Sequence, residues 1–328
     1  MLKLFERNTV VQVVIILMVT VLVWQKGYAT PLPMNTDGHF APLYSLLCDL
    51  HLASPVATTI ALLLSLLGGF FFNITLVRAG LASQNSLLPT LLFVLAVSAT
   101  SPSLSPTLLA TLVDVAFVSM LMLHSTLLTV SSDKIFGAAA LIGIASLLSL
   151  PALSLILAYA LIAINYRLYS WRDWMVFLLG LLAPYILLWT ILFLTGHIGE
   201  SLALMASDFS DIGLHIAPFT PLQAVANATL LIIFAAGLLV VWRHLGEKTV
   251  VWQKNATTIL LLTFAALASL LFSQTFPVRM QTLAIPFAFC TSFLLSLHKQ
   301  RRHGKHQAWR TRAFDLLFIV IILAAIAC

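Results

Sequence analysis

The residues of this chain that could do chemistry stand in short polar stretches between long apolar runs. One stretch is NTDGHFAP, in which Asp37 precedes His39 by two residues. A carboxylate just outside a membrane can act as a general base, and with a nearby imidazole it can hold a divalent cation. The alternative is a plain turn, because Asp-Gly is a strong turn signal. We predict Asp37 as a catalytic base and His39 as a substrate-binding residue.

A second polar stretch, residues 196–221, carries Asp208, Asp211 and His215 and contains no Lys or Arg. With Glu200 upstream, this spacing suits a loose cation site or polar contacts to a sugar. A solvated acidic loop would have the same sequence. We predict Asp208, Asp211 and His215 as substrate-binding residues, assign no cofactor, and keep a divalent cation as a candidate ligand.

Asp114 lies about eight residues into an apolar run, in ATLVDVAFV. An ionisable group at membrane depth is costly and is a functional candidate by default. The alternative is a buried Asp that is hydrogen-bonded to the many Ser and Thr side chains of the chain. Asp114 is therefore an intramembrane functional candidate.

Composition indicates what must position these residues. The chain of 328 residues is 61% hydrophobic and 9% charged, with a mean hydropathy of +1.04. A water-soluble domain cannot bury so much apolar surface, so we expect an all-α, polytopic membrane protein that contacts lipid. The net charge of +6 comes from short basic clusters between apolar runs, which is typical of topology signals and excludes nucleic acid as a partner.

Familiar catalytic motifs are absent. No GxxxxGK[ST], GxGxxG, HExxH or nucleophile elbow occurs. Cys48, Cys290 and Cys328 have no spacing that predicts a disulfide framework, and we predict no metal site from them.

We expect one integral membrane domain, residues 1–328, with about 11 membrane segments. The apolar runs lie at 9–25, 55–77, 86–101, 106–130, 135–166, 174–195, 221–242, 255–273, 281–298 and 313–328. The run 135–166 is too long for one crossing of a core roughly 30 Å thick, and Pro151 stands at its middle. We interpret it as a hairpin of two short helices that lie inside the bundle.

Basic residues decide between the hairpin and a single crossing. With a hairpin and a cytoplasmic N-terminus, all of the 17 Lys and Arg residues except Lys26 and Arg279 lie inside. A single crossing would place most of them outside. We therefore expect a bacterial inner-membrane protein with a cytoplasmic N-terminus, a periplasmic C-terminus and outer loops at about 26–54 and 196–220. Residues 41–52 repeat Leu at helical spacing and indicate an interfacial helix.

The middle of the chain resembles a known group of proteins. The most specific parts are LIGIASLLSLPALSLILAYALI and WRDWMVFLLGLLAPY, within roughly residues 80–195. They look like an uncharacterised family of Bacteroidota inner-membrane proteins, whose members often carry the label beta-carotene monooxygenase. Soluble carotenoid-cleaving enzymes are propellers with an iron held by four histidines, a framework that this all-helical chain does not offer.

The order of elements is also similar to that of membrane glycosyltransferases of the C-type fold. A first span is followed by an outer loop with an acid and an interfacial helix, and then by short helices. The resemblance implies transfer of a sugar from a polyprenyl-phosphate donor at the outer face, with the acid as base. Asp37, or less well Asp49, occupies the matching place, but a paired acidic motif is missing there.

The leading hypothesis is thus a glycosyltransferase-like enzyme that acts on polyprenyl-linked sugars in cell-envelope glycan assembly. In it, the hairpin would flank a groove for the lipid tail. The alternative is a non-catalytic membrane transporter, or a scaffold of envelope or secretion machinery, that uses Asp114 for proton coupling or helix packing.

Overall fold

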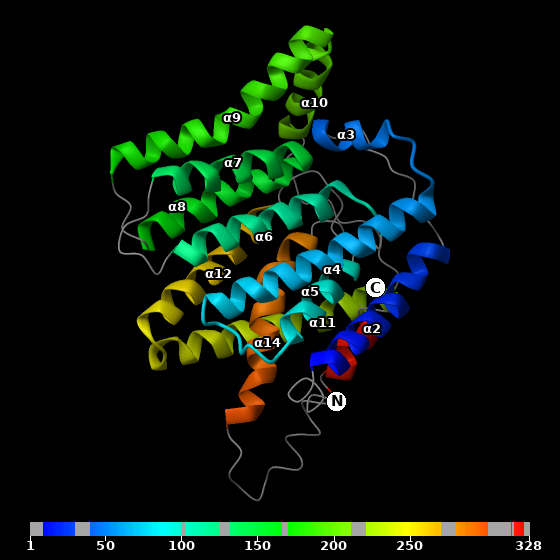
Figure 1. Ribbon diagram of the computed structural model, residues 1–328, viewed down its shortest axis with the longest axis vertical. Coiled ribbons are helices and arrows are strands. Elements are labelled where there is room, and N and C mark those ends of the chain that lie inside the picture. Colours follow the sequence, from blue (N-terminus) through cyan, green and yellow to red (C-terminus); the bar gives the residue numbers. More distant parts are fainter. Residues whose placement is uncertain are drawn as a thin grey trace, which may run out of the picture.

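A computed structural model describes residues 9–29, 40–99, 103–124, 132–165, 170–210, 221–269, 280–300, 316 and 318–324. These residues form α-helices and short 3₁₀ helices, and none of them is in a strand. The prediction of an all-α membrane protein is confirmed for this part of the chain. Several helices lie side by side with similar axes, and α14 crosses them more steeply (Figure 1).

Five helical segments are long and apolar enough to cross a membrane. They are α2 (Thr9–Ala29), α4 (Ser54–Arg78), α9 (Trp171–Thr195), Gln223–Glu247 and α12 (Val250–Ser269). Gln223–Glu247 comprises most of α11 (Pro221–His244) and the 3₁₀ turn η2 (Leu245–Glu247). About 20 helical residues span the hydrocarbon core, so each segment can cross it. The prediction of about 11 membrane segments is thus supported for five of them, and the remaining segments stay a prediction.

The other apolar helices are shorter. They are α5 (Leu88–Ser98), α6 (Pro106–His124), α7 (Ser132–Leu148), η1 (Leu150–Ser154), α8 (Leu155–Asn165), η3 (Met280–Leu283) and α14 (Ala284–Gln300). The 11 residues of α5 rise only about 16 Å, too little for a crossing. All of them except Ala96 are buried, so α5 is a short helix enclosed by the bundle.

The predicted break in the run 135–166 is present. Ser149 is extended, with φ −153° and ψ 114°, and Pro151 lies in the first turn of η1, between α7 and α8. Proline has no N–H to continue the hydrogen bonds of α7, and it fits the first turn of a new helix. Of the two arms, α7 packs between α6 and α9, and α8 packs on α12.

Close packing of α7 on α9 depends on two glycines. A Cβ atom built on Gly180 of α9 would lie 2.5 Å from the carbonyl oxygen of Phe136, and one built on Gly143 of α7 would lie 2.7 Å from that of Leu181. Any larger residue would push the backbones apart. Small residues at such positions let membrane helices approach closely.

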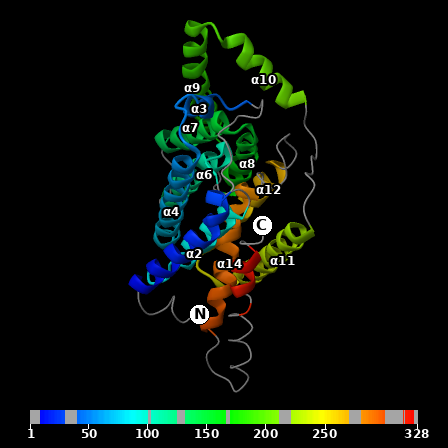
Figure 2. The ribbon, with the colours of Figure 1, turned by 90° about the vertical axis from the view of Figure 1, so that its right-hand side faces the viewer.

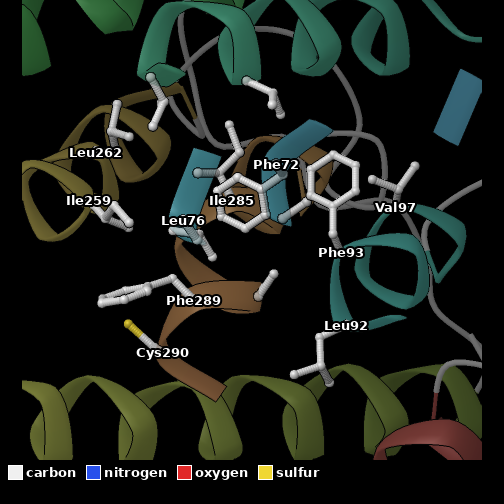
Figure 3. Packing of buried hydrophobic residues seen from close by; sticks show 14 of the residues in the cluster. Phe72, Leu76, Leu92, Phe93, Val97, Ile259, Leu262, Ile285, Phe289 and Cys290 are labelled. Carbon is white, nitrogen blue, oxygen red and sulfur yellow. The ribbon is translucent and has the colours of Figure 1, made fainter. Parts of the chain in front are cut away.

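The core lies around α5. Phe72 of α4 and Phe93 of α5 are fully buried, and their ring centroids are 5.7 Å apart. Figure 3 shows these rings with Val97 of α5, Ile259 of α12 and Phe289 of α14 directed toward one interior. Two pairs of helices from distant parts of the chain, α4 with α5 and α12 with α14, therefore share one apolar core.

Two short helices lie at one end of the bundle, here called the α3–α10 end. They are α3 (Pro42–Cys48), within the predicted interfacial helix, and α10 (Ile198–Ser210) (Figures 1 and 2). The predicted outer loop of about 196–220 contains α10, a helix that was not predicted, and its position outside the membrane stays a prediction. The less exposed positions of α10 are Ile198, Ser201, Met205 and Asp208. Their spacing places them on one side of the helix, turned toward the rest of the molecule.

Candidate functional site

The two polar stretches singled out in the sequence meet at the α3–α10 end. The backbone N–H of Phe40 donates a hydrogen bond of 2.8 Å to Oδ2 of Asp208, 168 residues away. Asp208 is only 7% exposed, so it is not part of a solvated acidic loop. Of the other predicted residues, Asp37, His39, Asp211 and His215 lie outside the described residues.

An apolar cluster encloses Phe40, which is 2% exposed. This Phe40 cluster combines residues of α7, η1 and α9 and is completed by the half-buried Met205 of α10; its buried members are Phe40, Leu147, Leu150, Tyr185 and Leu188. The turn of the helical hairpin thus lies at the same end of the bundle as α3 and α10. The cluster fixes the ring of Phe40 while Asp208 holds its backbone.

Two further hydrogen bonds tie this end together. The hydroxyl of Tyr44 in α3 donates to the carbonyl oxygen of Leu104 at 2.7 Å, and the hydroxyls of Ser146 and Tyr185 are 2.7 Å apart. All four residues come from different helices or connections, so the end is cross-linked by buried polar contacts. Nearby, burial raises the pKa of the Cys48 thiol above its ordinary value.

A buried polar cluster, here called the Gln281 cluster, joins helix ends inside the bundle. Oε1 of Gln281 accepts hydrogen bonds from the hydroxyls of Ser105, at 3.2 Å, and Thr107, and its Nε2 lies 3.5 Å from the carbonyl oxygen of Val97. The hydroxyls of Ser269 and Thr282 are 3.1 Å apart in the same region of η3. Since α5 ends and α6 begins here, these side chains pair polar groups that helix ends leave without partners.

The Gln281 cluster was not predicted. Its sequence signals are the run SATSPSLSPT between two apolar helices and a single Gln at the start of another. Ser, Thr and Pro at this density indicate a chain break. Nothing in the sequence relates that break to Gln281.

An apolar groove adjoins this cluster. It lies between the end of α5, the first half of α11 and the start of α14, and holds about 420 Å³ of empty space, a value that includes open solvent. Its lining residues are Ala96, Ala99, Asn227, Leu230, Leu231, Phe234, Leu283 and Phe287. No residue of the α7–α8 hairpin lines this groove. It is therefore not the groove beside the hairpin that the sequence led us to expect.

Asp114 is buried in α6, at 5% exposure. Its Oδ1 has no hydrogen-bond partner within the described residues. Among these residues, no Ser or Thr side chain therefore donates a hydrogen bond to this atom, as the alternative interpretation would require. Thr107, Thr111 and Asp114 are all buried, and their spacing places them on one face of α6. This face begins at the Gln281 cluster.

Among the described residues, no group of three or more His, Cys, Asp or Glu could hold a metal ion. The divalent cation considered with Asp37 and His39 stays a prediction, because both residues lie outside the described part.

Comparisons with known proteins add no relative. No family model, curated protein or solved structure matches this chain.

Proposed function

We propose that this integral membrane protein is an enzyme of the C-type glycosyltransferase kind that acts on polyprenyl-linked sugars at the outer face of the bacterial inner membrane, in cell-envelope glycan assembly. In this proposal the lipid chain occupies the groove between α5, α11 and α14. The sugar is held at the α3–α10 end, where Asp37 deprotonates the acceptor hydroxyl.

The observation that carries the proposal is an apolar groove beside a polar cluster. The groove lies between α5, α11 and α14. Its lining is apolar except for Asn227. Leu283 lines the groove two residues after Gln281, so one wall leads from apolar side chains to hydrogen-bonding groups. An amphipathic lipid needs these two environments side by side.

Short contacts connect the groove with the α3–α10 end. Ser105 bonds to Gln281, and the preceding residue, Leu104, accepts the hydrogen bond of Tyr44 in α3. A ligand that extends from the groove past the Gln281 cluster would therefore approach α3. These contacts support a position of the sugar head group near α3, the helix that follows the predicted base, Asp37, in the sequence.

The basic residues support the orientation. α4 begins shortly after α3, and α9 ends shortly before α10, so Arg78 and Arg172 lie at the ends of α4 and α9 that are far from the α3–α10 end. Lys134, near the start of α7, also lies far from that end, since α7 ends at the hairpin turn. Basic residues favour the cytoplasmic side, which makes the α3–α10 end periplasmic in this proposal.

The test is a pair of matched substitutions in the native host. Asp37→Asn removes the base, and Asp49→Asn removes the exposed acid at the end of α3. With both proteins at wild-type abundance, mass spectrometry of extracted lipid-linked saccharides should find the product lost by about 10²-fold or more in Asp37→Asn only. An unchanged product in Asp37→Asn would rule out the catalytic role.

A second candidate function, transport, is favoured by Asp114 alone. A buried carboxyl in a membrane helix is a typical proton-relay group, and one oxygen of Asp114 has no hydrogen-bond partner among the described residues. Reconstituted protein would then carry a proton-driven flux that Asp114→Asn abolishes. Loss of that flux with lipid-linked saccharides unchanged would favour the transporter over the enzyme.

A further inference from the structure

We infer that α10 lies on the membrane surface at the α3–α10 end and docks on lipid through an exposed apolar stripe. This stripe, here called the Leu202 stripe, comprises Leu202, Ala206 and Phe209, all of which are exposed. The partner is the lipid leaflet itself. The inference does not depend on the enzymatic activity proposed above.

The length and direction of α10 exclude a crossing of the membrane by this helix. Its 13 residues rise only about 20 Å, whereas the hydrocarbon core is roughly 30 Å thick. In both views α10 runs at a steep angle to α9 (Figures 1 and 2). Since α9 is long and apolar enough to cross the membrane, a helix that turns away from its axis lies along the surface.

The connection to α9 keeps α10 close to lipid. Phe193 and Leu194, in the last turn of α9, are exposed apolar side chains of a membrane helix. Gly196 ends α9 with a φ of +80°, and its N–H donates to the carbonyl oxygen of Phe193. Only two residues separate α9 from Ile198, so the Cα atom of Ile198 is within about 11 Å of that of the last residue of α9. The first turn of α10 therefore lies where the apolar end of α9 leaves the lipid.

The sides of α10 suit three different surroundings. Met205 and Asp208 face the bundle, where Met205 packs against the Phe40 cluster and Asp208 accepts the Phe40 N–H. Successive residues of an α-helix are about 100° apart. This spacing places the Leu202 stripe beside the bundle-facing side, and it places the exposed Glu200 and Ser207 away from the stripe. A helix with protein on one side, apolar groups on the next and polar groups beyond is typical of an interfacial helix.

The charges of α10 indicate how it binds lipid. The helix contains Glu200 and Asp208 and no Lys or Arg, so it has no cation to attract an anionic head group. The contact must therefore come from apolar side chains that leave water. Neutral lipid is sufficient for such a contact, which makes phosphatidylcholine vesicles a suitable membrane for the test.

The experiment compares two leucines of the same helix. Leu202 is 45% exposed and Leu204 is 40% exposed, but they lie about 160° apart around the helix axis. Each is replaced by Cys and spin-labelled in full-length, reconstituted protein whose native cysteines are Ser. Power saturation in electron paramagnetic resonance then measures collisions with oxygen, which concentrates in lipid, and with a neutral nickel complex, which stays in water.

We expect the ratio of oxygen to nickel accessibility to be several-fold higher at Leu202→Cys than at Leu204→Cys. Ala206→Cys and Ser207→Cys form a second pair, which should differ in the same direction if the first pair perturbs the helix. Equal ratios within both pairs would place α10 in water and overturn the inference. Low accessibility of Leu202→Cys and Ala206→Cys to both reagents would show that protein covers the stripe, which would also overturn it.

Discussion

The hydroxyl of Thr107, at the start of α6, donates a hydrogen bond to Oε1 of Gln281 in η3, 174 residues further along the chain. The same oxygen accepts from Ser105. This relationship joins the break between α5 and α6 to the start of α14, and it forms the polar side of the wall that continues into the groove at Leu283. The integrity of that junction is the first property to test.

Gln281→Leu should destabilise the protein by about 1–3 kcal/mol, because the hydroxyls of the buried Thr107 and the half-buried Ser105 lose their acceptor. Thermal unfolding in detergent measures the effect. Gln253→Leu is the matched control, since Gln253 is half-buried and donates to the carbonyl oxygen of Lys248 in the connection before α12; it should cost less. An equal loss in both variants would contradict a special role of the Gln281 cluster.

Ala96→Trp should fill the groove and displace a lipid chain. Ala96 lines the groove, whereas the exposed Ala228 of α11 does not, which makes Ala228→Trp the control. Native mass spectrometry of protein incubated with undecaprenyl phosphate should detect the bound lipid in the parent and the control, with about tenfold less in Ala96→Trp. Equal binding by all three proteins would locate the lipid elsewhere.

Gly180→Ala should separate α7 from α9. The added Cβ would lie 2.5 Å from the carbonyl oxygen of Phe136, a backbone atom that cannot turn away. We expect a loss of about 1–3 kcal/mol in unfolding free energy. Gly199→Ala in α10 meets nothing within 4 Å and should be neutral or slightly stabilising, since Ala favours helix over Gly. Similar unfolding temperatures for the two variants would refute the close approach.

Labelling of Cys48 should depend strongly on pH. Burial raises the pKa of its thiol, and only the thiolate reacts. Below that pKa the thiolate fraction grows about tenfold per pH unit, so the rate with a charged maleimide should rise steadily from pH 7 to pH 9. Cys290 and Cys328 are replaced by Ser, and Cys48→Ser serves as the blank.

The same reagent reports the side of the membrane on which α3 lies. In cells with a permeable outer membrane and an intact inner membrane, Cys48 should react without further permeabilisation. Reaction only after the inner membrane is opened would place α3 in the cytoplasm and would contradict the proposed orientation.

Much of the architecture could be predicted from local features of the sequence. A composition that is 61% hydrophobic and 9% charged indicates membrane helices whatever their arrangement. The break at Pro151 could be predicted because proline lacks the N–H that a continuing helix needs. The extent of α5 could not, since its short, buried helix depends on the helices around it.

The candidate site could be predicted only in part. Asp208 was singled out, but the helix that carries it was not predicted, because its polar neighbours conceal the helical spacing of Leu202, Met205 and Phe209 in α10. A helix of 13 residues has little stability alone and depends on packing, which here is the contact with the Phe40 cluster. The sequence offers no signal for that contact.

Chain composition and the position of one proline are thus enough to establish an all-helical membrane protein with a hairpin at its middle, because each is a local or additive property. The pairings of Phe40 with Asp208 and of Thr107 with Gln281, and the groove beside α5, follow from the folded arrangement alone. They join residues more than 160 positions apart, and such partners are selected by how the helices pack against one another.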